Sequence, residues 1–181
     1  MSTYLSLFVL FAGLSIGKGP QPSWMQVTSR DAGFTVAVPG APTALPTQTL
    51  QTGHALLYLH YWKVEKRPLL YLVSYGDAAT GRLPESLPPD ALAPLFRAAR
   101  DRILKEWHGR LVSERKLSPN GHQGDEILVE TPEGLVLHMR TYAVMLRASL
   151  HIYQIIAVSR KQDASSPDAA RFLSSFKLLA D

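Results

Sequence analysis

The stretch LVLHMRTYAVMLRASLHIYQIIAVS, residues 135–159, decides the fold. Polar or aromatic side chains alternate with aliphatic ones along much of it, as they do in strands whose two faces differ. We predict two long strands, Leu135–Val144 and Ala148–Ser159, joined by a tight connection near Met145–Arg147. The other predicted strands extend this hairpin into a sheet.

The predicted hairpin has two chemically different faces. A tight connection pairs Val144 with Ser149, and this register places Tyr142 opposite His151. One face is then aliphatic. The other, which we call the polar-aromatic face, holds His138, Arg140, Tyr142, His151 and Tyr153. Because Arg and Tyr anchor many interfaces, we predict this face as a possible binding surface. The alternative is that these residues only stabilise the sheet as cross-strand pairs under a covering helix.

Further strands lie on both sides of the hairpin. Asn120-Gly121 is a strong signal for a hairpin turn, and Thr131-Pro132-Glu133-Gly134 fits a turn that leads into the long hairpin. Residues 110–159 are therefore predicted to form a four-strand antiparallel meander. The upstream strands are predicted to join the same sheet, with the prolines at 42 and 46 keeping the chain around them unpaired. Outside the hairpin we predict strands at 24–28, 34–38, 48–64, 69–75, 110–117 and 125–130.

Two helices are predicted. The long one, Ala91–His108, follows Asp90, a good N-cap residue, and carries an apolar stripe at steps of three and four. The short one opens with Ser166-Pro167-Asp168, which supplies a cap, a proline at the first helical position and an acid at the positive end of the helix dipole. It is predicted to end near Ser174. The predicted fold class is therefore α+β: one antiparallel sheet flanked by helices, in a single domain of residues 24–181.

The first residues are typical of an export signal. Leu5–Ile16 is an apolar run without charge, followed by small residues at Ser15, Gly17 and Gly19. Spanning a bilayer takes about 20 residues, so the run fits the apolar region of a secretory signal that is cleaved after Gly17 or Gly19. No Lys or Arg precedes it. We predict a signal peptide or N-terminal anchor over residues 1–19 and a linker over 20–23; the alternatives are a buried first element of the domain or a retained membrane anchor.

The composition is that of a globular chain. Hydrophobic residues make up 46% of the 181 residues and charged residues 19%, and the formal net charge is +4. Lys and Arg are scattered without a run of five, so we expect no nucleic acid as a partner. Cysteine is absent, which excludes disulfides, thiolate metal sites and a cysteine nucleophile.

The sequence contains no motif of catalysis or metal binding that we can identify. Gly-x-Ser-x-Gly and His-Glu-x-x-His are absent, and no loop has the spacing that cradles phosphate. His54 and His60 share a predicted strand face but lie roughly 20 Å apart, and His138 lies about 13 Å from the level of His151. Ligands of one zinc ion each lie about 2 Å from it. We therefore predict no catalytic residue, no cofactor and no metal.

Several short patterns resemble the PsbP-like family, whose fold is related to an extrinsic subunit of photosystem II and to the Ran guanine-nucleotide release factor. The resemblance covers about residues 24–181. It rests on Gly33-Phe34-x-Val36-x-x-Pro39-Gly40-x-Pro42, Tyr71-x-Val73-Ser74-Tyr75-x-Asp77, Arg140-x-Tyr142 with Tyr153, and Arg171-Phe172-Leu173-x-Ser175-Phe176. It implies an antiparallel sheet with helices on its faces, an α/β/α sandwich, and no catalytic residues. Because fold does not fix function, the photosystem role does not follow.

These observations favour a non-catalytic binding or accessory protein outside the cytoplasm, periplasmic or secreted. Its partner is expected to be a protein or small ligand of the cell envelope, and it would meet the membrane only through an uncleaved N-terminal segment. Two other classes stay open. One is a cytosolic protein-interaction module, in which residues 1–20 belong to the fold. The other is a hydrolase or metal-dependent enzyme whose site is assembled only in three dimensions.

Overall fold

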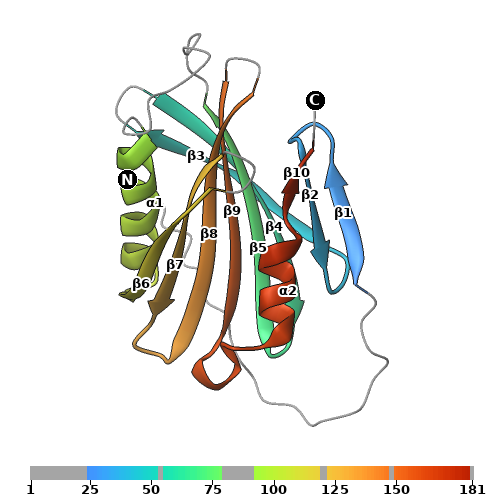
Figure 1. The fold of residues 1–181 in the computed structure, drawn as a ribbon, viewed down its shortest axis with the longest axis vertical. Coiled ribbons are helices and arrows are strands. Elements are labelled where there is room, and N and C mark those ends of the chain that lie inside the picture. The colour runs from blue at the N-terminus through green and yellow to red at the C-terminus, as the bar shows by residue number, and fades with distance from the viewer. Residues whose placement is uncertain (1–23, 53–54, 79–91, 119–121, 147–148, 180–181) are drawn as a thin grey trace.

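The computed structural model describes residues 24–52, 55–78, 92–118, 122–146 and 149–179 (Figure 1). The predicted signal peptide and linker, the predicted Asp90 cap and the Asn120-Gly121 turn lie outside the described residues. No helix in the described ranges combines the length and apolar character needed to cross a membrane.

Most of the described chain is β-strand, arranged in two antiparallel sheets. The large sheet has the order β3-β4-β5-β9-β8-β7-β6, and the small sheet has the order β1-β2-β10. The strands of the large sheet are β3 (Thr43–Thr52), β4 (Ala55–Lys66), β5 (Leu69–Ala78), β6 (Arg110–Leu117), β7 (Gln123–Glu130), β8 (Leu135–Leu146) and β9 (Ser149–Arg160). Those of the small sheet are β1 (Met25–Ser29), β2 (Phe34–Val38) and β10 (Lys177–Leu178).

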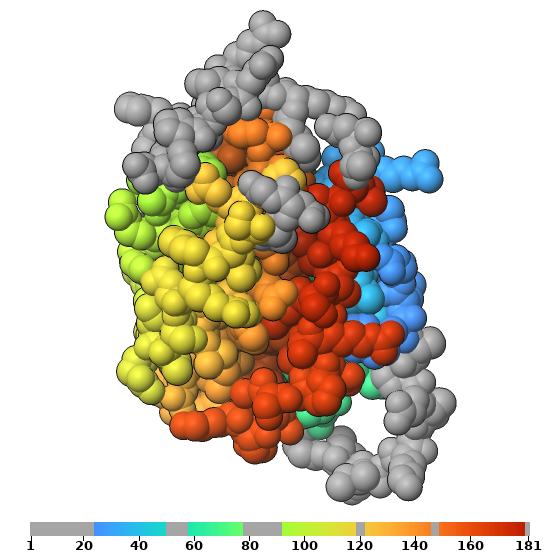
Figure 2. All heavy atoms as spheres, in the orientation of Figure 1, coloured from blue at the N-terminus to red at the C-terminus, as the bar shows by residue number. Residues whose placement is uncertain are grey.

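Each face of the large sheet has a different cover. Helix α1 (Ala93–Glu106) packs on one face, where Ile103 joins a core with Leu137, Met139 and alternate residues of β5 and β9. Helix α2 (Pro167–Ser175) and the small sheet pack on the other, where Phe172 and Phe34 join Tyr153. Figure 2 shows the red atoms of the C-terminal segment beside the blue atoms of the small sheet on this second face.

The predicted α/β/α sandwich, with one sheet flanked by helices, is wrong. Two α-helices lie in the described residues, and most of the second cover is β-structure. The upstream strand at 34–38 is correctly placed, but it does not join the large sheet. It pairs with β1 on one side and with Lys177–Leu178 on the other. β2 is buried at almost every position. An edge position in the large sheet would leave one side of the strand open, whereas here β1 and β10 pair with it on both sides.

The four-strand meander β6-β7-β8-β9 is confirmed, with a change in the register of the central hairpin. The structure pairs Leu146 with Ser149, Val144 with His151 and Tyr142 with Tyr153. The register therefore differs from the predicted one by two residues. A shift of one residue would exchange the faces of a strand, whereas a shift of two preserves them. For this reason the polar-aromatic face has the predicted members.

The region 43–64 differs from its prediction. Instead of an unpaired stretch followed by one long strand, it forms the antiparallel pair β3–β4. The register of this pair shifts between Leu45 and Gln48, at the point where Pro46 lies. Proline lacks the N–H that a regular ladder needs and is tolerated at edges and bulges. β3 is the edge strand, so the proline is accommodated without ending the pairing.

The helix predictions are confirmed in type and place. α1 begins at Ala93 with Leu92 as its N-cap, two residues later than predicted, and buries Phe96 and Ile103. At α2, the Ser166 side chain accepts a hydrogen bond from the backbone N–H of Asp168 at 3.3 Å. This is the predicted cap.

Replacement of Phe172 tests the attachment of α2. Its side chain is fully buried, and its ring meets that of Tyr71 edge-on with centroids 5.0 Å apart. We expect Phe172→Ala to lower the free energy of unfolding by roughly 3–5 kcal/mol, because it leaves a cavity between the helix and the sheet. Ser174→Ala, on the exposed side of the same helix, should change it by less than about 0.5 kcal/mol. Urea unfolding measures both, and equal effects would contradict this packing.

Candidate binding surface

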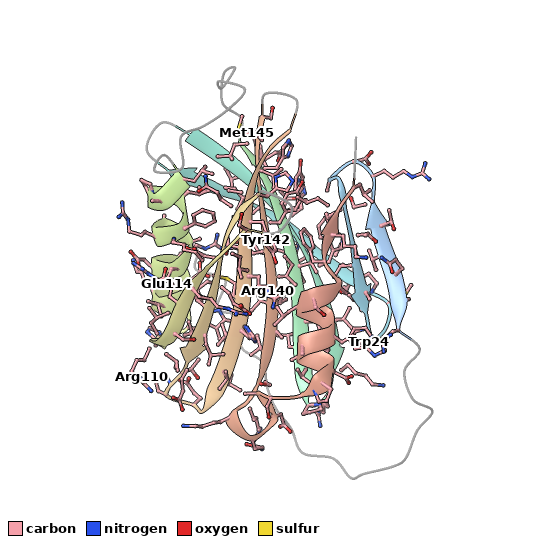
Figure 3. All side chains as sticks on the ribbon, viewed as in Figure 1. Trp24, Arg110, Glu114, Arg140, Tyr142 and Met145 are labelled. Carbon is pink, nitrogen blue, oxygen red and sulfur yellow. The ribbon has the colours of Figure 1, made fainter. Side chains whose placement is uncertain are left out.

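The five residues of the polar-aromatic face lie on one side of the large sheet, as predicted, but they fall into three environments. Tyr142 and Tyr153 are buried, whereas His138, Arg140 and His151 are partly buried. Arg140 and Tyr142 lie near the middle of the sheet, between β8 and the layer that contains α2 (Figure 3). His151 lies beside Val144 near the hairpin end, where Met145 is labelled.

Tyr142 and Tyr153 belong to the core between the two sheets. Tyr142 stacks on Phe176 with ring centroids 5.3 Å apart and an interplanar angle of 5°. Tyr153 has no exposed surface, and its hydroxyl donates to the backbone carbonyl of Ala32 at 2.9 Å. Its ring also meets the edge of Phe34 at 6.0 Å. These two tyrosines therefore hold the layers together and are not available to a partner from outside.

His138 and Arg140 surround a buried acid on β7. The side chain of Glu126 is 5% exposed, and its Oε1 accepts from Arg140 Nε at 3.1 Å. His138 Nε2 and the guanidinium of Arg115 also contact this carboxylate. Arg140 Nη1 donates to the carbonyl of Leu173 at 3.0 Å, in the last turn of α2, where helix carbonyls lack partners within the helix. The Glu126 group therefore connects three strands to α2.

The charge of Glu126 is stabilised by its neighbours. Burial alone would raise its pKa, but the hydrogen bonds from His138 and Arg115 and the positive charge of Arg140 outweigh burial and hold the pKa below its usual range. A buried carboxylate with this many donors is a structural element of the fold, since removing one member leaves an uncompensated buried charge. Arg115 is the largely exposed member, and it faces solvent at the outer end of the group.

His151 takes part in a row of rings that crosses the sheet at the hairpin end. The hydroxyl of Tyr75 is 3.0 Å from His151 Nδ1, and the two rings stack with centroids 5.5 Å apart. His60 stacks on the same tyrosine at 6.0 Å. Burial and the negative charge of Asp77 raise the pKa of Tyr75 to about 12, so its hydroxyl stays neutral at physiological pH.

Asp77 lies within this group. In the strand register it is opposite Tyr58 on β4 and opposite His151 on β9. Its Oδ1 is buried and has no hydrogen-bond partner among the described residues. We name this group the hairpin-end cluster: Tyr58, His60, Tyr75, Asp77 and His151. Tyr58 is 40% exposed, so the cluster reaches the surface.

Sequence reasoning found one member of the cluster, His151, and missed four. The alternation of Tyr58 with His60 and of Tyr75 with Asp77 was visible in the sequence, and it indicates that each pair shares a strand face. What the sequence did not reveal was the pairing of β5 with β9, which brings residues 76 positions apart into hydrogen-bond contact. Without that pairing, the sequence did not indicate which residues lie beside the polar side chains of β5.

The described residues do not bring together the ligands of a metal ion, and the hydrogen bonds of His60 within them do not form a catalytic relay. Thr47 Oγ1 lies 3.2 Å from His60 Nδ1, but no carboxylate hydrogen-bonds to this imidazole within the described ranges. In the same part of the chain, no three His, Cys, Asp or Glu side chains converge as metal ligands would. The cluster offers stacked rings, imidazole nitrogens and one carboxylate acceptor, which are groups suited to binding.

Replacement of Glu126 tests the structural role of the Glu126 group. A carboxylate whose pKa is lowered by folding stabilises the protein above its unfolded-state pKa, and this contribution is lost as the pH falls through the folded-state value. We expect Glu126→Gln to lower the free energy of unfolding at pH 7 by roughly 2–4 kcal/mol. The difference from wild type should shrink as the pH falls below about 4.5.

Urea unfolding across this pH range measures the effect. Glu114→Gln is the control, because Glu114 is 27% exposed, against 5% for Glu126, and pairs with Arg100 of α1; such exposed pairs contribute up to about 1 kcal/mol. A loss for Glu126→Gln that stays constant down to pH 2 would contradict the electrostatic role.

Comparison with known proteins supports the fold. No protein-family model matches this chain, and no curated protein matches it in sequence. Among solved structures, it is similar to the solution structure of cyanobacterial PsbP (CyanoP) from Synechocystis sp. PCC 6803, with a TM-score of 0.54 and 10% sequence identity. The match covers 91% of this chain and 97% of that chain. The fold is therefore PsbP-like, as the sequence resemblance implied.

Proposed function

We propose that this protein is a non-catalytic binding or accessory protein outside the cytoplasm, and that its ligand or partner meets the hairpin-end cluster. The observation that carries the proposal is the change of environment along the polar-aromatic face. In the middle of the sheet, α2 and the small sheet bury Tyr142 and Tyr153. At the hairpin end, the same face carries partly exposed rings and a buried carboxylate oxygen without a partner among the described residues.

The chemistry of the cluster supports binding over catalysis. A nucleophile needs an adjacent base that is itself oriented by a third group. Here the ring of His151 is bonded and stacked to Tyr75, whose pKa of about 12 makes it a poor proton donor or acceptor near neutral pH. Aromatic rings with a few placed polar groups are the side chains that line ligand-binding sites.

The location outside the cytoplasm is proposed from the sequence. The uncharged apolar run Leu5–Ile16 and the small residues that follow it have the pattern of a secretory signal. The PsbP-like fold is compatible with this proposal but does not determine it, since one fold serves many functions. Cleavage after Gly17 or Gly19 would leave the domain free of its N-terminal segment.

Photo-crosslinking in cells tests both parts of this proposal. A photoreactive phenylalanine analogue replaces Tyr58 in the cluster in one variant and Val112 in another. Val112 is a matched control, because it is 46% exposed, close to the 40% of Tyr58, and lies on the distant edge strand β6. We expect covalent adducts from position 58 only, on protein whose intact mass shows a chain beginning at Lys18 or Pro20. Adducts at position 112 alone, or equal adducts at both positions, would contradict the surface; a full-length chain in the cytosol would contradict export.

A further inference from the structure

The carboxylate of Asp77 is the least satisfied polar group of the hairpin-end cluster. Its Oδ1 is buried and accepts no hydrogen bond from the described residues. No described Lys or Arg forms a salt bridge with it, whereas the buried acids Asp125 and Glu126 both have cationic partners. Leaving a buried acceptor unpaired costs free energy, more for a charged group than for a neutral one. Such an atom in a native structure therefore calls for a donor from elsewhere.

The side chains around Asp77 define what that donor can be. Tyr58 and His151 flank it in the strand register, and Tyr75 lies near enough for the charge of Asp77 to raise the pKa of its hydroxyl. Aromatic faces attract cations, and a carboxylate repels anions. The rings of His60, Tyr75 and His151 are stacked, which fixes their orientation before any ligand arrives.

The geometry also discriminates between kinds of cation. The buried acceptor that has no partner among the described residues is Oδ1, and one N–H donor satisfies it. A guanidinium donates through a planar fork that matches both oxygens of a carboxylate, whereas the buried acceptor here is Oδ1 alone. A quaternary ammonium has no N–H and would leave Oδ1 unpaired. A primary ammonium carries three donors on a compact charge, so it can bond to Oδ1 and still lie against the rings.

We propose that the hairpin-end cluster binds a primary ammonium group, with Asp77 Oδ1 accepting its hydrogen bond and the exposed ring of Tyr58 lining the site. This inference deepens the proposed function and rests on it, because it assigns a ligand chemistry to the same surface. The ammonium group belongs either to a free alkylamine or to a lysine side chain of a partner protein. Both present the same donor to Asp77.

The test is a titration of the full domain with defined ammonium probes at constant ionic strength, followed by the amide and ring NMR signals of the cluster. n-Butylammonium represents a free amine, and Nα-acetyl-lysine methylamide represents a protein side chain. Tetramethylammonium is the control that carries the charge without a donor. We expect saturable shifts with at least one of the two primary ammonium probes, and at least tenfold weaker binding of tetramethylammonium.

Two variants make the result specific. Asp77→Asn removes the charge with little change of shape and should weaken binding at least tenfold. Asp163→Asn, at the opposite end of β9, should leave binding unchanged. Since Asp77 Oδ1 has no hydrogen-bond partner among the described residues, Asp77→Asn should also leave the urea midpoint unchanged or raise it, whereas a structural acid would lower it.

Equal binding of tetramethylammonium, undiminished binding by Asp77→Asn, or no saturable shift with either primary ammonium would overturn the ammonium assignment. Crosslinking at position 58 without ammonium binding would leave the proposed function standing and would remove only this ligand class. Loss of both would remove the surface itself.

Discussion

One buried tyrosine, Tyr153, joins the two layers of β-structure in this protein. Its ring lies under Phe34 and Phe176, and its hydroxyl donates to the carbonyl of Ala32, which directly precedes the β1–β2 turn glycine, Gly33. Buried hydroxyls are in most cases paired, and here the turn of the small sheet supplies the carbonyl of Ala32 to this one. The position of the cover on the large sheet is therefore fixed at the level of Tyr153.

That constraint decides which part of the polar-aromatic face remains accessible. On one side of Tyr153, the Glu126 group and Arg140 fasten α2 to the meander. On the other side, across β5 and β4, the rings of Tyr75 and His60 continue the row from Tyr153 and are only partly buried. The candidate site thus lies where the cover ends. A sheet that is covered on both faces over most of its area can present ligand-binding side chains there without weakening its core.

Sequence patterns predicted local features well and long-range arrangement poorly. The strand 34–38 and the helix opened by Ser166 were predicted at or near their bounds, because alternation and capping are properties of neighbouring residues. The pair β3–β4 was not predicted, because Pro46 argues against strand pairing. The proline is tolerated because β3 is an edge strand whose register shifts at this point. The small sheet was not predicted, because its strands β2 and β10 are more than 140 residues apart in the sequence and their pairing leaves no local signal. His151 was predicted because it lies in the local β8–β9 hairpin, whereas Asp77 meets it only through the long-range pairing of β5 with β9.

The division of one sheet face into a closed core and an accessible end is the central claim, and paramagnetic solvent mapping tests it most directly. A neutral gadolinium chelate broadens the ring proton signals of side chains that it can approach. The account predicts strong broadening for Tyr58, His60 and His151, with Tyr142 and Tyr153 unaffected, in agreement with their burial. Broadening of Tyr142 and Tyr153 equal to that of Tyr58 would show that the small sheet and α2 do not cover this face, and it would contradict the account.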